Sequence, residues 1–331
     1  MCCIPGKRRK WRSFTDPMKR AIVTGPTGAI GLALIRKLKS AGVDVTAIVR
    51  PDSPRNKRVR ELGVQVAECD LSDLLSLEDV FKEQYSDSQD AVFYHLGWMG
   101  TSGAARNDMG LQLENVAYTL DAVELAHLLG CRRFVGVGSQ AEYGRVDGVL
   151  HAHTPCHPEN GYGIGKLAAG QMSRLLCEKL GMEHVWTRVL SVYGSGDADH
   201  TLISVLIDTL AKGEVPHCTK GEQIWDYLYA DDAAEILHCL GDAKGASGQT
   251  FCLGSGSAKP LRDYMEEVRN AVAEVTGKEV PEIICDRPYP EGQVMHLEAD
   301  VSELIRVIGD VQRVPFKEGI RETVRDRLDR P

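Results

Sequence analysis

The 331-residue sequence lacks the features that mark several classes of protein. No apolar run approaches the ~18 residues of a membrane-spanning helix, and the formal charge of −8 argues against broad binding to nucleic acid or anionic membranes. The ten cysteines are scattered without a CxxC pair, and the opening residues contain no apolar core of a secretory signal. We therefore expect reduced thiols, a cytoplasmic location, and neither a nucleic-acid nor a membrane partner.

Two short segments invite a functional interpretation. Residues 1–17 carry five basic side chains and one acidic one, which predicts a basic, disordered leader, with a targeting tail or lipidation at Cys2 and Cys3 as alternatives. The segment HAHTPCH offers four possible zinc ligands. Donors so close together in a proline-containing loop strain to surround one tetrahedral ion. A polar surface loop is favoured there, and no metal is predicted.

Short β-branched runs alternate with longer helical patterns from residue 21 to about residue 191. The run AVFYHLG (91–97) is nearly all apolar, as expected for a strand that is buried on both faces of a parallel sheet. Another strand is expected to run through HVWTRVLSVYG (184–194), and beyond it the alternation weakens. The pattern predicts an α/β fold: a Rossmann doubly wound parallel sheet with a smaller, mixed C-terminal region.

The segment TGPTGAIG lies between the first expected strand and the first expected helix. It places Gly25, Gly28 and Gly31 at GxxGxxG spacing. Glycines permit a tight turn there and let the backbone approach a pyrophosphate, which then sits at the positive N-terminus of the helix. The order of strand, turn and helix predicts a dinucleotide site.

The ends of the next two strands bear on the choice of cofactor. Arg50 stands nineteen residues after Gly31, at the end of the second expected strand. A carboxylate at this position would bind the ribose 2′-hydroxyl and repel a 2′-phosphate. A guanidinium suits a phosphate dianion, so NADP(H) is favoured and NAD remains possible, while a solvated surface arginine is the alternative. Asp70 closes the third strand, where its side chain either accepts from the adenine amine or caps a helix.

These assignments define the expected domains. Residues 18–190, together with about 228–255, form the NAD(P)-binding Rossmann domain. Residues of about 191–227 and 256–331 form the substrate-binding region.

Three side chains form a candidate catalytic group. Tyr162 and Lys166 stand four residues apart on an expected helix and so share one face. A free phenol has a pKa near ~10, and a nearby ammonium lowers it by favouring the phenolate. Ser139, at the end of the preceding strand, is placed to donate a hydrogen bond to a reacting carbonyl oxygen.

From Met18 to the C-terminus, the chain resembles the extended short-chain dehydrogenase/reductases, in particular their NAD(P)-dependent epimerase/dehydratase group, which acts on nucleotide sugars. The resemblance includes TGPTGAIG, GSQAEYG, YGIGK, RVLSVYG and GEQIWDYLYADDAA in this order. It implies that Tyr162 is the general acid/base, Lys166 its partner and Ser139 the carbonyl-binding hydroxyl. It further implies the following cofactor-binding residues: Gly25, Thr27, Gly28, Ala29, Ile30 and Gly31 in the pyrophosphate loop, Asp70 and Leu71 at adenine, Leu96 and Gly97 over the ribose and nicotinamide, Asn115, and Leu190 near nicotinamide. Asn115 braces its helix in the alternative interpretation.

The chain differs from this group at residues that are expected to act on or bind the substrate. The 4,6-dehydratases carry a Thr-Asp-Glu run where this chain has Ser139, Gln140 and Ala141. Neither of the last two can move a proton, and Glu142 is expected to point to the opposite face of a strand. Dehydration is therefore disfavoured.

The resemblance places Ser191 at the substrate, but many epimerases have an arginine on the diphosphate where this chain has Trp225. Tryptophan cannot supply that charge, although it can stack on a base or sugar. Arg287 is an alternative phosphate clamp or a surface residue.

The resemblance implies an enzyme that moves hydride at C4 of a nucleotide-activated sugar and works as a homodimer. An epimerase and an NADPH-dependent 4-ketoreductase both fit these residues, and we do not separate them here. A non-catalytic dinucleotide sensor or scaffold is the alternative of another class.

Overall fold

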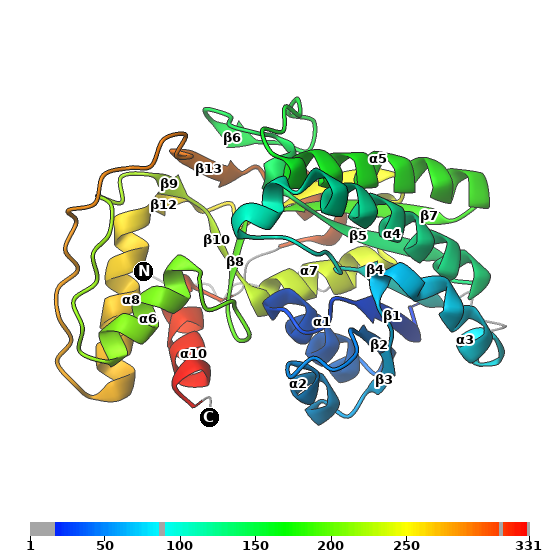
Figure 1. Cartoon of the computed structure of the whole chain (residues 1–331), viewed down its shortest axis with the longest axis horizontal. Helices are drawn as coiled ribbons and strands as arrows, with labels where there is room; N and C mark the ends of the chain where they lie inside the picture. The colour runs from blue at the N-terminus through cyan, green and yellow to red at the C-terminus, as the bar shows by residue number, and fades with distance from the viewer. Residues whose placement is uncertain (1–16, 86–89, 311–313, 330–331) are drawn as a thin grey trace, which may run out of the picture.

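The computed structural model describes residues 17–85, 90–310 and 314–329. Its main feature is a parallel sheet of seven strands in the order β11–β7–β5–β4–β1–β2–β3 (Figure 1). The chain runs outward from β1 through β2 to β3, and then returns to β4 on the other side of β1, which creates a topological switch point. The strands are β1 (Arg20–Thr24), β2 (Asp44–Val49), β3 (Gln65–Glu68), β4 (Ala91–His95), β5 (Arg133–Ser139), β7 (Glu183–Val189) and β11 (Gln249–Leu253). The predicted fold class is confirmed.

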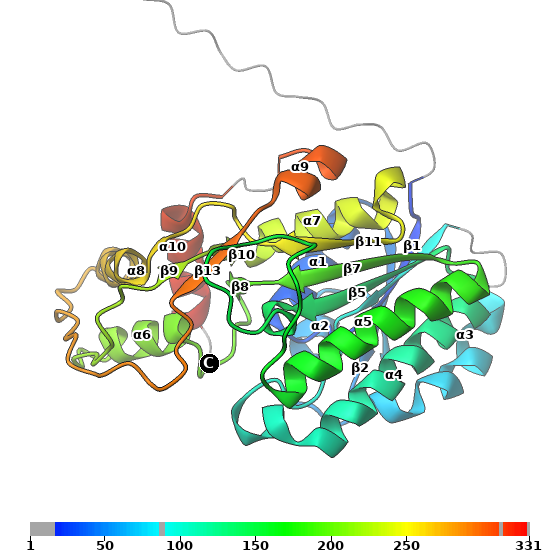
Figure 2. The same ribbon diagram turned by 90° about the horizontal axis from the view of Figure 1, so that it is seen from above.

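Helices cover both faces of this sheet (Figure 2). Ile22 and Val23 are neighbours on β1, yet they are buried in two different apolar clusters. One cluster is completed by α1 (Ala29–Ser40), α2 (Asn56–Glu61), α7 (Ala230–Asp242) and α9 (Ser302–Ile308). The other is completed by α3 (Leu77–Tyr85), α4 (Met109–Leu128) and α5 (Gly161–Leu180). Burial on both sides explains the nearly continuous apolar sequence of the central strands.

The C-terminal part has its own core at the left of Figure 1. There α6 (Leu202–Ala211), α8 (Leu261–Thr276) and α10 (Phe316–Leu328) pack around a group of aromatic and aliphatic side chains. Two small sheets join this part to the main sheet. One pairs β10 (Tyr227–Tyr229) with β8 (Ser191–Tyr193), and the other has the order β12 (Lys259–Pro260), β9 (Ile224–Trp225), β13 (His296–Ala299) and β6 (Val149–Leu150). The 3-10 helices are η1 (Leu71–Ser76), η2 (Gly103–Asn107), η3 (Gln140–Glu142) and η4 (Lys244–Ala246).

One predicted strand and the predicted position of Glu142 were wrong. The strand expected over 184–194 is broken at Leu190, and its second half, β8, leaves the main sheet to pair with β10. The strand entering GSQAEYG ends at Ser139 as expected, but Glu142, which was expected on a strand, lies in η3. Both differences lie at the carboxyl edge of the sheet, where the chain turns away to build a site. The predicted leader, apart from Pro17, lies outside the described residues.

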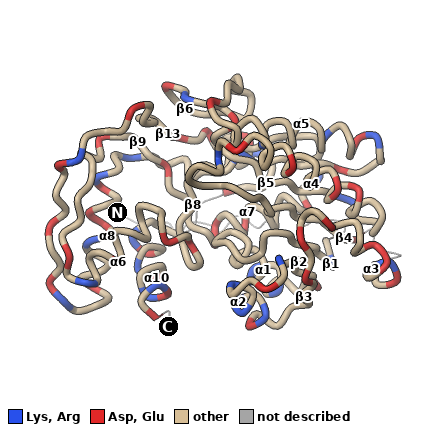
Figure 3. The backbone as a smooth tube through the Cα atoms, in the orientation of Figure 1, with Lys and Arg blue, Asp and Glu red and all other residues tan. Residues whose placement is uncertain are grey.

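Lys and Arg alternate with Asp and Glu over most elements, and a group of basic positions lies at α2 (Figure 3). In the part of the chain that the structure describes, we find no helix with the length and hydropathy needed to traverse a bilayer.

A single buried carboxylate ties the C-terminal region to the main sheet. Asp226, fully buried between β9 and β10, accepts from Ser255 N (2.6 Å) and Ser255 Oγ (2.7 Å) at the end of β11. It also accepts from Gly256 N (3.1 Å) and from Ala299 N (3.2 Å) on β13. Hydrogen bonds to a charged acceptor contribute ~1.5–3 kcal/mol each, and their loss would leave buried donors without partners.

We therefore expect Asp226→Ala to lower the free energy of unfolding by ~3 kcal/mol or more, measured by urea denaturation. Asp231→Ala removes the same kind of side chain from an exposed ion pair with Arg36 and is expected to cost less than ~1 kcal/mol. Equal effects of the two substitutions would contradict this account of Asp226.

Candidate active site

The glycine-rich turn between β1 and α1 is packed tightly at its ends and open in its middle. Gly25 has φ +66°, and a Cβ on it would lie 2.6 Å from the carbonyl carbon of Leu96. A Cβ on Gly31 would lie 2.5 Å from the Gly25 oxygen. Gly28, the N-cap of α1, has no neighbouring atom within 4 Å of its ideal Cβ. The geometry therefore fits a pyrophosphate that approaches the backbone at Gly28 and at the start of α1.

The residues expected around adenine and ribose lie beside this turn. Gly97 N donates to Thr24 Oγ1 (3.2 Å), and Leu71 Cδ2 lies 2.9 Å from the position of a Cβ on Gly97. Leu96 N donates to the Thr24 carbonyl (3.2 Å). Asp70 is exposed at the N-cap position of η1, but its side chain makes no capping hydrogen bond. The helix-cap alternative for Asp70 thus has no hydrogen bond to support it.

Arg50 lies directly after β2 and is exposed. Its carbonyl accepts from Asn56 Nδ2 (2.9 Å), which links it to the start of α2. The helix and its N-cap contribute Arg55, Lys57, Arg58 and Arg60 to the basic group visible in Figure 3. Two of these cations form ion pairs, Lys57 with Glu61 and Arg60 with Glu68.

Asn115 braces the segment that follows β4. Its Oδ1 accepts from Met99 N (2.8 Å), and its Nδ2 donates to the carbonyls of Met99 (3.0 Å) and Leu111 (2.9 Å). The side chain is buried with both amide hydrogens used. These contacts match the bracing alternative, and Asn115 fixes the strand end that carries Leu96 and Gly97.

Ser139 and Tyr162 meet because Gly163 allows α5 to approach η3. Ser139 ends β5, and its Oγ accepts from Ala141 N (3.2 Å). Tyr162 lies in the first turn of α5, where a Cβ on Gly163 would lie only 2.3 Å from the Ala141 oxygen. Burial raises the pKa of the Tyr162 phenol, whereas a hydrogen bond with Ser139 and the charge of Arg106 lower it. The serine and tyrosine predicted from sequence are therefore brought together.

Lys166 is buried one turn further along α5. Its Nζ donates to the Val137 carbonyl (2.6 Å) and lies 3.9 Å from the centroid of the Trp98 ring. Burial lowers the pKa of this amine to about 7, and the negative charge of Glu142 opposes that shift. The amine is thus engaged with β5 and Trp98, and its expected effect on Tyr162 stays a prediction.

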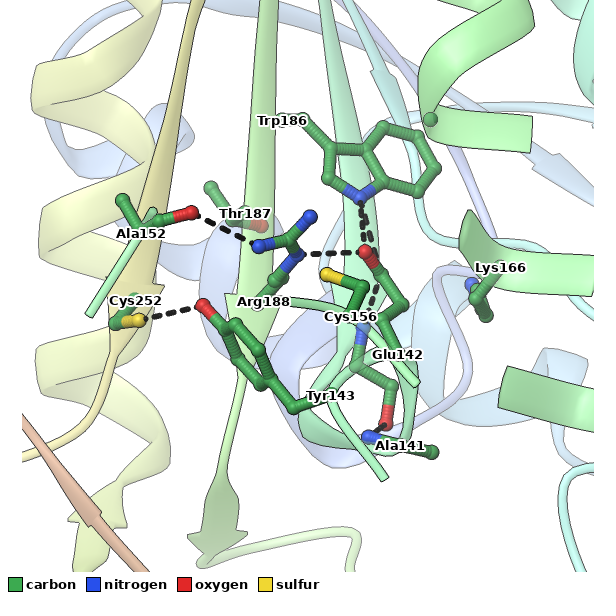
Figure 4. A network of polar contacts seen from close by, with 12 residues as sticks. Ala141, Glu142, Tyr143, Ala152, Cys156, Lys166, Trp186, Thr187, Arg188 and Cys252 are labelled. Atoms are coloured by element: carbon green, nitrogen blue, oxygen red, sulfur yellow. Dashed lines mark hydrogen bonds and ion pairs between the residues drawn. The ribbon is translucent and has the colours of Figure 1, made fainter. Parts of the chain in front are cut away.

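Glu142 belongs to a buried network behind the site (Figure 4). Its Oε1 accepts from Ser139 N (2.9 Å) and Trp186 Nε1 (3.0 Å), and its Oε2 pairs with Arg188 Nε (2.7 Å). Arg188 also donates to the Ala152 carbonyl (2.9 Å). Glu142 therefore faces away from the site because of η3 and its ion pair, not because of strand alternation as expected from sequence.

The expected substrate residues separate into two places. Ser191 Oγ accepts from Trp225 Nε1 (2.9 Å), so these two lie side by side on β8 and β9. Leu190 N donates to the Leu253 carbonyl (2.9 Å) at the end of β11. Arg287 is exposed on the loop after α8, where its backbone N–H donates to the Cys218 carbonyl (3.0 Å). The structure links Ser191 with Trp225 but gives Arg287 no contact with either.

Three residues at the site were missed from sequence. Trp98 lies over Lys166 and contacts the Tyr162 ring edge-on at 6.1 Å, and Gln112 accepts from its indole N–H (2.8 Å). Arg106 lies over the Tyr162 ring at 4.4 Å. Trp98 directly follows the YHLG motif, so its place at the site could have been inferred from the sequence. Arg106 lies in a polar loop, and its sequence context does not indicate a place at the site. Gly165 on α5 lets the helix approach these residues closely, because a Cβ there would lie 3.2 Å from both the Gln112 oxygen and Trp98.

The histidine-rich segment is held by carboxylates. His151 Nδ1 pairs with Asp300 (2.9 Å), and His153 lies 3.6 Å from Glu303. A different group of potential metal ligands comes together on α7, formed by Glu235, His238 and Cys239. Glu235 there already forms an ion pair with Lys37 (2.5 Å).

An open glycine turn at the switch point, with a serine at a neighbouring strand end and a tyrosine and a lysine on the adjoining helix α5, defines a dinucleotide-binding protein of the Rossmann class. A family model described as NAD dependent epimerase/dehydratase family matches residues 21–254. The chain belongs to this family.

Individual relatives carry out different reactions. The UDP-glucose 4-epimerase of Azospirillum brasilense is 25% identical over 293 residues, which cover 82% of each protein. The dTDP-4-dehydro-6-deoxy-D-allose reductase of Streptomyces bikiniensis is 27% identical over 331 residues, covering 93% of this chain and 95% of that protein. dTDP-glucose 4,6-dehydratases also match. The chain is thus similar to epimerases, reductases and dehydratases of nucleotide sugars alike.

Among solved structures, MoeE5 in complex with UDP-glucuronic acid and NAD superimposes with a TM-score of 0.78 at 25% identity. The match covers 93% of this chain and 98% of that one.

The glycine turn yields a test that separates folding from cofactor binding. Gly28→Ala places its Cβ in open space, so the melting temperature should stay within ~2 °C of the wild type while NAD(P)H affinity falls about tenfold or more. Gly31→Ala meets backbone atoms and should lower both. Fluorescence titration and thermal unfolding measure the two quantities, and unchanged affinity in Gly28→Ala would contradict the assigned pyrophosphate position.

Proposed function

We propose that this chain is an NAD(P)-dependent nucleotide-sugar epimerase that moves hydride at the C4 carbon of the sugar. The main observation that supports this proposal is that Ser139 and Tyr162 lie together at the carboxyl edge of the sheet, beside the open glycine turn. An NADPH-dependent 4-ketoreductase that makes a deoxysugar nucleotide uses the same residues and is the second candidate, since a reductase relative aligns over nearly the whole chain.

The bound dinucleotide supplies the hydride acceptor and donor. Tyr162 takes the C4 hydroxyl proton as the carbonyl forms and returns it when the carbonyl is reduced. Ser139 Oγ donates a hydrogen bond to that oxygen and stabilises the charge that develops on it. Lys166 is assigned to the cofactor ribose and, with the adjacent strand end, orients the ring that exchanges hydride.

The buried network argues against a 4,6-dehydratase. That reaction needs an acid and a base beside the tyrosine, at the positions of Gln140 and Ala141. Glu142 is the nearest carboxylate in sequence, but it accepts from Ser139 N and Trp186 and pairs with Arg188. A buried carboxylate with such partners cannot leave them for the substrate without leaving Arg188 unpaired.

The nucleotide half of the substrate is assigned to the C-terminal region. Trp225 offers an aromatic face and Ser191 a hydroxyl to this half of the substrate. Arg287 is the residue proposed to bind the diphosphate. Relatives whose names include UDP- and dTDP-sugars support a nucleotide-sugar substrate without selecting the base.

The deciding experiment incubates the protein and Tyr162→Phe with a panel of nucleotide sugars and 4-keto nucleotide sugars. Isomerisation at constant NAD(P)H identifies the epimerase, and net NADPH consumption identifies the reductase. Tyr162→Phe should lower kcat at least ~100-fold while cofactor affinity changes little, because general acid–base catalysis contributes ~10²–10⁴. Cofactor binding without turnover of any substrate would favour the sensor or scaffold instead.

We infer that NADP(H) is preferred, because Arg50 directly follows β2 and is linked to the start of the basic helix α2, and a guanidinium suits a phosphate dianion. Arg50→Gln should weaken NADPH about tenfold and leave NADH unchanged, since only NADPH carries the additional phosphate. Isothermal titration with both cofactors measures this difference. Arg145→Gln, which removes an exposed arginine paired with Glu159, is the matched control. Equal weakening of the two cofactors would exclude a contact with the 2′-phosphate.

The homodimer stays a prediction, and an exposed apolar surface supports it. Helices α4 and α5 pack side by side on one face of the molecule (Figure 2). Their exposed apolar residues are Met109, Leu113, Leu128, Ile164, Met172 and Leu175.

A further inference from the structure

Arg106 is a cation at the catalytic tyrosine that the proposed mechanism does not use. Its guanidinium carbon lies 4.4 Å from the centroid of the Tyr162 ring. Nη1 donates to the Thr101 carbonyl (2.9 Å), and the residue is partly buried. In the described ranges 17–85, 90–310 and 314–329, no carboxylate pairs with Arg106. Arg133 and Arg188, by contrast, pair with Glu183 and Glu142.

The position of Arg106 is set by its own backbone. Asn107 Oδ1 accepts from Gly161 N (3.0 Å), and Gln112 Nε2 donates to the Ala105 carbonyl (2.8 Å). Gly161 leaves room for η2, because a Cβ there would lie 3.1 Å from the Arg106 oxygen. Helix η2 is therefore attached to the first turn of α5, the turn that carries Tyr162. This contact holds the guanidinium over the phenol ring.

We propose that Arg106 is a positioning residue whose charge stabilises the phenolate of Tyr162, which is the role that sequence assigned to Lys166. The inference rests on Tyr162 being the acid/base of the proposed function. Deprotonation spreads negative charge over the phenol ring, so a guanidinium on its face favours the phenolate.

The other groups around Tyr162 make this contribution necessary. Ser139 on β5 lowers the pKa of the phenol by hydrogen bonding, whereas burial and the charge of Glu142 on η3 raise it. Trp98 presents its ring edge-on and carries no charge. Burial lowers the pKa of Lys166 to about 7, so its amine carries less charge at neutral pH than an ordinary lysine, and its Nζ is bonded to Val137. An arginine stays charged throughout this range.

The test measures the titration of Tyr162 directly, without substrate. Ultraviolet difference absorbance of tyrosinate, with the matching Tyr162→Phe protein subtracted, reports the pKa of this phenol in the full-length chain. Arg106→Gln should raise it by about one unit, since an opposite charge at this range shifts a pKa by ~1–3 units and partial exposure weakens it. Arg106→Lys should restore most of the difference. Arg174→Gln, an exposed arginine further along α5 that pairs with Glu178, should have no effect.

The same variants are then compared in the pH profile of kcat with the substrate identified from the panel. The limb that reports Tyr162 should move to higher pH in Arg106→Gln in either reaction direction, because removal of the cation favours the protonated phenol. An unchanged tyrosine titration, with or without a raised KM for the sugar, would overturn the proposal. A shifted titration in a protein that turns over no sugar nucleotide would keep this inference and reject the proposed function. Thermal unfolding of each variant confirms that the fold is retained.

Discussion

The buried ion pair between Glu142 and Arg188 is the interaction on which the geometry of the site depends. Glu142 holds Ser139 through its backbone N–H and closes η3 onto the end of β5. The position of η3 in turn sets the surface that α5 meets at Gly163. A buried pair of charges is weak evidence for stability, but removal of one partner leaves the other without compensation. The pair therefore gives the catalytic edge one well-defined arrangement.

Packing around a single indole supports the same arrangement from behind. Trp186 on β7 donates to Glu142 and lies against Gly136 and Gly138 of β5 and Gly170 of α5. A Cβ at any of these three glycines would lie within 3 Å of Trp186 atoms. The strand, the following turn and the catalytic helix thus share one packing centre, and their relative positions are hard to change separately.

Sequence periodicity could predict most of the sheet but not its carboxyl edge. The strands buried on both faces and the glycine turn follow directly from β-branched runs and strand–turn–helix order. Glu142 was misplaced because the alternation of strand side chains does not continue past Ser139, where η3 begins, and Leu190 breaks a run that reads as one strand. Arg106 was missed because its contact depends on how a loop of irregular sequence folds onto α5. Lys166 was found by its spacing, but its partners lie far from it in the sequence: Val137 is on β5, and Trp98 is on the segment after β4.

The environment of Lys166 also has a consequence for how ligand binding and proton uptake are linked. With a pKa of about 7, the buried amine is only partly protonated at neutral pH in the free protein. A ligand that accepts hydrogen bonds from its ammonium form, such as a sugar diol, favours that form and so draws a proton from solution. Binding at this position is therefore coupled to buffer ionisation and weakens as the pH rises above neutrality. With Lys166 on the cofactor ribose, as proposed, this coupling makes cofactor occupancy sensitive to pH.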